Sequence, residues 1–153
     1  PQHAQMVKEI DLAAKALGVK VLYLDVQSPK DIETAFRAAS KGRAGAGVVL
    51  GSPVLNSQRT LIVELAAKSR LPVTYIRPEY VEDGGLMTYG PNINDLFRRA
   101  ATYVDKILKG RTPADLPVEQ PMKFEFAINL KTAKQLGLEI PQWTLMKADR
   151  VIK

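Results

Sequence analysis

The sequence predicts an α/β protein in which a parallel sheet is flanked by helices, and two patterns carry this prediction. Stretches with apolar residues at helical spacing alternate at short intervals with short runs rich in β-branched residues. Glycine or proline separates most of these stretches. Such alternation is typical of parallel strands joined by right-handed helical crossovers. The length of 153 residues is sufficient for one compact domain.

The chain is expected to begin with a helix and a buried strand. Apolar residues at helical spacing predict a helix over 4–17, and Gly18 follows where a left-handed residue ends a helix. The run VKVLYLDV over 19–26 is rich in β-branched and aromatic residues, which predicts a mostly buried strand. The pattern opens on a helix, with no initiator Met and no preceding strand, so we expect a fragment of a longer protein.

The next elements repeat this order. Ser28, Pro29 and Asp31 are expected to be the N-cap, the first helical position and the first-turn acid of a second helix. GAGVVL over 45–50 and PVTYI over 72–76 predict two further strands. Between them, apolar residues at helical spacing predict another helix: Leu61, Ile62, Leu65 and Ala66.

The stretch EDGGLMTYGPN over 82–92 predicts an extended run between two breaks. Gly84 and Gly85 permit a sharp turn into the run, and Gly90 with Pro91 permits a break out of it. A long amphipathic helix over 92–109 is expected next, with Asn92 as its cap and Gly110 as its stop. Its apolar stripe is Ile93, Leu96, Phe97, Ala100, Val104, Ile107 and Leu108.

The remainder is expected to be a connector, a strand and short helices. RTPADLPVEQP over 111–121 has three prolines in eleven residues and predicts an extended connector. MKFEFAIN over 122–129 alternates apolar and polar positions, which predicts a half-exposed strand. A short helix through Leu136 and an end segment around Trp143 complete the prediction.

The formal net charge of +6 does not predict a nucleic-acid partner. Residues 1–97 hold eleven lysines and arginines against ten acidic residues, and residues 98–153 hold eleven against six. Acidic residues interrupt this second group, and aromatic residues do not alternate with the basic ones. A solvated basic face is the better interpretation, so we expect no nucleic-acid binding.

The chain lacks the residue combinations that most catalytic sites need. It has no cysteine, and its one histidine is His3, which disfavours a Ser-His-Asp relay and a multi-histidine metal site. No GK[ST] motif occurs, and the glycines from Gly42 to Gly47 end a helix and enter a strand, opposite to a dinucleotide loop. Glu79, Glu82 and Asp83 are more typical of solvated loop acids than of catalytic ones. We therefore expect no enzyme, no cofactor and no metal site.

Polar and aromatic residues follow the predicted strands and suggest a ligand site. In open parallel sheets, ligands bind at the carboxyl ends of the strands. Ser52 and Asn56 follow one strand where a helix begins, so their side chains and nearby N–H groups can receive a carboxylate. Tyr80 and Tyr89 can flank an apolar or aromatic group. The alternative is that Ser52 and Asn56 only cap helices and that both tyrosines pack in the core.

Several stretches resemble a known family. EYVEDGGLMTYGPN, YVDKILKGRTPADLPVEQP and KFEFAINLKTAKQLGLEIP resemble the ABC-transporter substrate-binding proteins of the tryptophan/tyrosine-binding type, and GSPVLNSQR and RLPVTYI match as well. The likeness covers nearly the whole chain. It implies one lobe of a type I periplasmic-binding-protein-like fold, in a periplasmic or exported and membrane-associated receptor. Such a receptor traps a small amino-acid-like or aromatic solute between two hinged lobes and delivers it to an ABC permease.

The resemblance also implies a division of the chain. Residues 1–88 correspond to the second, C-terminal lobe, and residues 89–120 to a hinge, a helix of the first lobe and the proline-rich connector. Residues 121–153 correspond to the returning crossover strand and terminal helices. The implied hinge residues are Gly85, Gly90 and Pro91.

Two expectations follow from this division. The first lobe is missing, so the apolar stripe of the 92–109 helix is expected to be covered by another copy, through dimerisation or domain swapping. The alternative function is a ligand-sensing domain of a transcriptional regulator, because such sensors share the lobe architecture.

Overall fold

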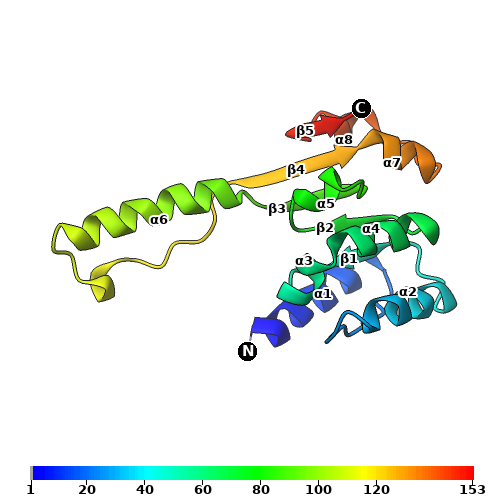
Figure 1. Ribbon diagram of the computed structural model, residues 1–153, viewed down its shortest axis with the longest axis horizontal. Coiled ribbons are helices and arrows are strands. Elements are labelled where there is room, and N and C mark those ends of the chain that lie inside the picture. The colour runs from blue at the N-terminus through cyan, green and yellow to red at the C-terminus, as the bar shows by residue number, and fades with distance from the viewer. Residues whose placement is uncertain (1) are drawn as a thin grey trace. The chain divides into compact units, whose positions relative to one another are not determined.

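The computed structural model describes the backbone of residues 2–153 and the side chains from residue 5 onward. The side chain of His3 therefore lies outside the described residues. The chain forms two compact units, residues 1–44 and residues 45–153 (Figure 1).

Over residues 2–44, the first unit contains two helices and no strand. Helix α1 spans Gln2–Leu17, and Gly18 follows it with a φ of +64°, as the sequence predicts. The strand predicted over 19–26 is wrong, because none of the strands in the described residues pairs with this segment. A strand needs a neighbour to satisfy its backbone N–H and C=O groups, and side-chain alternation alone does not supply one. Tyr23 is instead exposed at 47%, and its hydroxyl donates to Asp11 Oδ1 at 2.8 Å.

Helix α2 spans Asp31–Lys41 and begins later than the sequence suggested. Ser28 is not its N-cap, because its backbone N–H and hydroxyl both donate to Asp31 Oδ2, at 2.8 and 2.9 Å. The bond from the Ser28 hydroxyl, followed by that from its N–H, lowers the pKa of Asp31. The carboxylate thus orders the turn before the helix, and Asp31 is the first-turn acid that the sequence predicts.

The second unit is built on a five-stranded mixed sheet. Its strands lie in chain order and span Gly47–Val49 (β1), Val73–Tyr75 (β2), Met87–Pro91 (β3), Phe124–Asn129 (β4) and Arg150–Ile152 (β5). Neighbouring strands are parallel except β3 and β4, which are antiparallel. The sheet is therefore mostly parallel, with one antiparallel pair where the chain returns through β4. Strand β5 was not predicted from the sequence.

Helices surround this sheet and contribute to its core. They span Pro53–Ser57 (α3), Arg59–Lys68 (α4), Glu79–Glu82 (α5), Leu130–Gln135 (α7) and Gln142–Leu145 (α8). The largest fully buried side chains of the unit include Tyr75, Tyr80 and Ile62. The Thr132 hydroxyl donates to the Gly84 carbonyl at 2.7 Å, which ties α7 to the turn after α5. The core therefore combines aromatic packing with hydrogen bonds between separate elements.

Burial along β4 changes from one end to the other instead of between its faces. Phe124 is 49% exposed at the start, whereas Ala127, Ile128 and Asn129 are buried at the end. The sequence predicted a half-exposed strand with one wet face. Both faces of the last three residues of β4 are covered. The small Ala127 and the helix-capping Asn129 fit this buried end, after the aromatic Phe124 and Phe126.

Helix α6, Ile93–Leu108, has no buried residue among its members, unlike the helices α2 and α4. Asn92 caps it by accepting from the Asp95 N–H at 2.9 Å, and Gly110, with a φ of +94°, follows its end. The connector contains a short 3-10 turn, Pro113–Asp115, and returns beside α6 (Figure 1).

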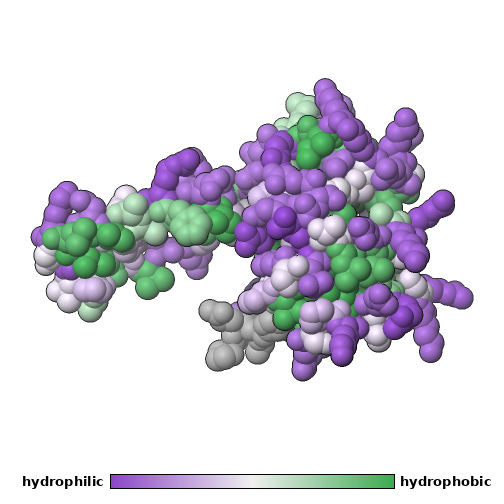
Figure 2. Space-filling model, in the orientation of Figure 1, coloured by the Kyte–Doolittle hydropathy of each residue, from purple (hydrophilic) through white to green (hydrophobic). Residues whose placement is uncertain are grey.

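The apolar stripe of α6 is only partly covered by this connector. The Tyr103 hydroxyl donates to the Pro117 carbonyl at 2.7 Å, and Arg99 forms an ion pair with Glu119. The two segments enclose a shallow groove of about 440 Å³. Apolar side chains remain exposed along both segments (Figure 2): Phe97, Val104, Ile107, Leu108 and Val118. This apolar surface is larger than the connector can shield.

Gly90 is required by the close approach of β3 to β2. A Cβ at this position would lie 2.1 Å from the carbonyl oxygen of Ile76. We expect Gly90→Ala to force the strands apart and to lower the free energy of unfolding by about 3 kcal/mol in urea titrations.

Gly45→Ala is the matched control, because a Cβ there meets nothing within 4 Å. Its effect is expected to stay below about 0.5 kcal/mol. Equal unfolding midpoints for the two variants would contradict the proposed steric constraint.

Candidate functional site

The carboxyl ends of the parallel strands β1 and β2 lie next to each other at one edge of the sheet. Val49 pairs with Tyr75 in register, so the residues that follow them leave the sheet together. Gly51 lies against Ile76, because a Cβ on Gly51 would be 2.6 Å from Ile76 Cδ1. Ser52 and Arg77 each come directly after one of these touching residues, which places both beside the same edge.

Ser52 acts as the N-cap of helix α3. Its Oγ accepts from the Leu55 N–H at 3.1 Å, and its carbonyl accepts from the Asn56 N–H at 2.9 Å. Pro53 occupies the first helical position, where its missing N–H is not needed. The capping role considered in the sequence is thus present, and it fixes the start of the helix that carries Asn56.

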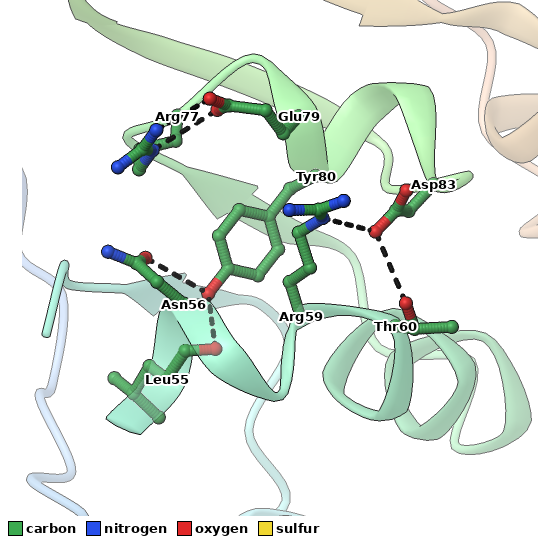
Figure 3. Close-up of polar contacts among 8 residues, drawn as sticks. All are labelled: Leu55, Asn56, Arg59, Thr60, Arg77, Glu79, Tyr80 and Asp83. Carbon is green, nitrogen blue, oxygen red and sulfur yellow. Dashed lines mark hydrogen bonds and ion pairs between the residues drawn. The ribbon is translucent and has the colours of Figure 1, made fainter. Parts of the chain in front are cut away.

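Tyr80 connects α5 to this segment. Its hydroxyl lies 2.9 Å from the Leu55 carbonyl, to which it donates, and 3.5 Å from Asn56 Oδ1 (Figure 3). The ring is only 2% exposed and stacks on Tyr75 with centroids 4.5 Å apart. Tyr80 is therefore a core residue whose hydroxyl end reaches the candidate site.

The two stacked tyrosines differ in their hydrogen bonding. Among the described residues, the buried hydroxyl of Tyr75 has no hydrogen-bond partner. Burial raises the pKa of Tyr75. Burial also raises the pKa of Tyr80, against the opposing effect of the positive charges of Arg59 and Arg77. Both phenols are therefore neutral at physiological pH.

Three acidic residues in or next to α5 each bind a different arginine. Glu79 accepts from Arg77 at 2.6 and 3.1 Å, and this bonding lowers the pKa of Glu79. Asp83 accepts from Arg59 Nε at 2.6 Å, and it also accepts from the Thr60 hydroxyl at 3.3 Å (Figure 3). Glu82 pairs with Arg150 at 3.1 Å.

The sequence predicts that these acids are solvated loop residues, whereas the structure pairs each of them with an arginine. The carboxylates are held by arginines from different elements and do not converge on one point. Within the described residues, no group of three or more His, Cys, Asp or Glu side chains is arranged to hold a metal ion.

Tyr89 lies in the middle of β3 and packs with two phenylalanines of β4. It is 58% exposed and stacks on Phe124 at 5.6 Å, with Phe126 edge-on at 6.2 Å. Tyr75 pairs with Thr88, so Tyr89 points to the opposite face of the sheet from Tyr75. The structure therefore does not bring Tyr80 and Tyr89 together as two sides of one slot.

The three residues implied as a hinge have different surroundings. Gly85 lies under the Tyr75 ring, and a Cβ there would be 2.7 Å from the Tyr80 carbonyl oxygen. Gly90 adjoins Ile76, and Pro91 ends β3 opposite Phe124. Gly85 and Gly90 both permit close packing, while the positive φ of +103° belongs to Gly84.

Sequence reasoning missed the arginines of the site and the aromatic partner of Tyr89. Arg77 directly follows Ile76 at a strand end, which was a usable signal. The pairing of Arg59 with Asp83 spans 24 positions and left no local signal. Phe124 was placed on the correct strand, but its stacking on Tyr89 depends on the antiparallel register of β3 and β4.

The fold and the placement of these residues define a class of protein. The chain is one lobe of a type I periplasmic-binding-protein-like fold, and Ser52, Asn56 and Tyr80 follow the carboxyl ends of β1 and β2 in it. The chain belongs to the ABC transporter substrate binding protein family, whose sequence pattern matches residues 2–152. It is thus a member of a family of solute-binding proteins.

Solved structures agree with this assignment. An ABC domain from Streptococcus pneumonia in complex with L-Trp is 27% identical, with a TM-score of 0.87 over 98% of this chain and 52% of that one. A conserved domain protein from Vibrio cholerae is 24% identical, with a TM-score of 0.89 over 97% and 50% of the two chains.

A third structure is more distant. It is the ligand-free, open form of a substrate binding protein with adhesive properties from Clostridium difficile, 21% identical, with a TM-score of 0.69 over 99% and 50%. The chain therefore spans about half the length of the solved structures that it matches. No curated protein matches the chain.

The tyrosine pair provides a matched test of the hydrogen bonds. Tyr80→Phe removes a hydroxyl with an acceptor and is expected to lower the free energy of unfolding by about 1 kcal/mol. Tyr75→Phe removes a buried hydroxyl without an acceptor among the described residues and is expected to be neutral or stabilising. Denaturant unfolding of both variants measures the difference. A loss for Tyr75→Phe as large as that for Tyr80→Phe would mean that the Tyr75 hydroxyl has a partner, such as a bound water.

Proposed function

We propose that this chain forms one wall of the solute site in a two-lobed receptor of an ABC importer. The chain has no catalytic role in this proposal. The observation that carries it is the assembly of Ser52, Asn56 and Tyr80 at the carboxyl edge of a lobe that belongs to a substrate-binding family. The length of the similar structures, about twice that of this chain, supports a second lobe opposite this edge.

The proposed solute is a small amino-acid-like or aromatic molecule. Tyr89 and Phe124 offer an exposed aromatic surface that suits a planar group. Asn56 and the start of α3, fixed by Ser52, offer polar groups for the other end of the solute. Tyr80 contributes by holding Leu55 and Asn56 in place. The complex of a 27% identical ABC domain with L-Trp supports this choice of ligand class.

The division of the receptor follows the sequence prediction. Residues 1–88 are proposed as the C-terminal lobe, residues 89–120 as the hinge with a helix that serves the first lobe, and residues 121–153 as the return. Gly85, Gly90 and Pro91 are proposed to flank the moving segment. An ABC permease is the proposed membrane partner, and a periplasmic or exported, membrane-associated location is proposed with it. None of the helices in the described residues is long and apolar enough to cross a membrane.

A thermal-shift experiment tests the ligand class. The gene product that contains this chain is expected to melt at a higher temperature with L-tryptophan, L-tyrosine or L-phenylalanine, because a ligand that binds only the folded state stabilises it. Tyr89→Ala is expected to weaken binding roughly threefold to tenfold through the lost aromatic contact.

Tyr23→Ala is the control, because Tyr23 is a similarly exposed tyrosine that is not among the proposed site residues. Its ligand affinity is expected to equal that of the wild type. No melting shift with any of the three amino acids would argue for another ligand class.

The exposed stripe of α6 generates a separate prediction for the 153-residue chain alone. We expect this chain to dimerise or swap through α6, because Phe97 is 71% and Leu108 82% exposed and both lie on an apolar stripe. Light scattering across a concentration series should show self-association, which the double change Phe97→Glu and Leu108→Glu should abolish.

Met146→Glu removes an equally exposed apolar side chain elsewhere and is expected to leave self-association unchanged. A clean monomer at high concentration would count against the proposed role of α6.

A further inference from the structure

The guanidinium of Arg77 is held on one side and open on the other. Its Nε donates to Glu79 Oε2 at 3.1 Å and its Nη2 to Glu79 Oε1 at 2.6 Å. A guanidinium carries five N–H donors, so this pairing leaves the edge that contains Nη1 available. No other acceptor is bonded to Arg77 in the described part of the chain, and the side chain is 39% exposed. Glu79 therefore fixes the guanidinium without occupying it fully.

Asn56 adds a second set of free donors beside this arginine. The Tyr80 hydroxyl lies 3.5 Å from Asn56 Oδ1, so the amide oxygen faces the phenol and Nδ2 faces away from it. Asn56 Nδ2 donates to no acceptor among the described residues. Figure 3 shows the Asn56 amide and the Arg77 guanidinium on the same side of the Tyr80 ring.

The surrounding contacts place these two donors at one location. Gly51 lies against Ile76, which joins the start of the α3 segment to the residue before Arg77. The positive charge of Arg77 also acts on the Tyr80 phenol, whose hydroxyl contacts Asn56. The other nearby arginine, Arg59, is held by Asp83 on the far side of the ring (Figure 3). Arg77 and Asn56 therefore present N–H donors together at the carboxyl edge of the sheet.

We propose that Arg77 is the counter-ion for a carboxylate group of the solute and that Glu79 is the residue that positions it. A carboxylate matches the planar fork of a guanidinium with two parallel hydrogen bonds, and the Asn56 amide can donate a third. Glu79 holds the guanidinium in one orientation before the solute arrives, which reduces the side-chain ordering needed on binding. The inference rests on the proposed solute-binding function and narrows the ligand to carboxylate-bearing molecules.

Calorimetric titration of the gene product that contains this chain tests the inference. The probes are L-tryptophan, L-tyrosine and L-phenylalanine, each beside the amine that lacks its carboxylate: tryptamine, tyramine and phenethylamine. The wild type is expected to bind at least one acid roughly a hundredfold more tightly than the matching amine, because the donors would otherwise stay unpaired.

Arg77→Met is expected to weaken binding of that acid roughly tenfold to a hundredfold and to leave the amine unchanged. Arg77→Lys keeps the positive charge but not the planar guanidinium, so it should weaken binding of the acid less than Arg77→Met does. Glu79→Gln should weaken binding of the acid a fewfold through poorer positioning, again without an effect on the amine. Arg37→Met removes an exposed arginine of the pair with Glu33 and serves as the control with wild-type affinity.

The outcomes separate the inference from the function on which it rests. Equal affinity for acid and amine, or an acid affinity that Arg77→Met leaves unchanged, would overturn the role of Arg77 while the solute site stands. Absence of binding by all six probes to the wild type would overturn the aromatic amino-acid ligand and the inference with it. Melting curves of each variant show whether a loss of binding reflects a loss of folding. If Arg77→Met does not fold, the affinity of Arg77→Lys for the acid tests the role of Arg77 instead.

Discussion

The candidate site depends on the packing of two glycines around Ile76. Gly51 lies against the end of its side chain, and Gly90 lies against its carbonyl oxygen so closely that the backbone leaves no room for a Cβ on Gly90. The strands β1, β2 and β3 can therefore end close together. This closeness brings Ser52, Arg77 and the end of β3 to one edge of the sheet. The chemistry of the edge thus follows from a steric constraint in the backbone.

A second group of contacts keeps this edge in shape. The α5 segment is bound through Asp83 to Arg59, through Glu82 to Arg150, and through the buried Tyr80 ring to Tyr75. Exposed ion pairs contribute little stability individually, so the buried ring stack carries most of the packing. The ion pairs instead set the orientation of side chains. They turn the acidic side chains toward arginines and leave N–H donors facing the carboxyl edge of the sheet. An edge with free donors is suited to an anionic group.

The sequence was informative where a single element carries the signal. The cap at Asn92, the stops at Gly18 and Gly110, and the strands β1 and β2 that precede Ser52 and Tyr80 all have local signatures, and the structure contains them. The run over 19–26 has the composition of a strand but lacks a pairing partner among the described residues, a property that composition does not encode. The same limit applies to β5, to the Arg59–Asp83 pair and to the stacking of Phe124 on Tyr89. Each of these depends on which distant segment becomes a neighbour.

Hydrogen–deuterium exchange on the gene product, with and without saturating aromatic amino acid, tests the central claim most directly. If the solute binds at the carboxyl edge, amide exchange should slow in peptides covering residues 50–57, 76–80 and 89–92, because ligand contacts reduce local opening. Peptides from the opposite edge of the sheet, such as residues 130–137 of the segment that includes α7, should keep their exchange rates. Protection confined to that opposite edge, with no change over residues 50–57 and 76–80, would contradict the account.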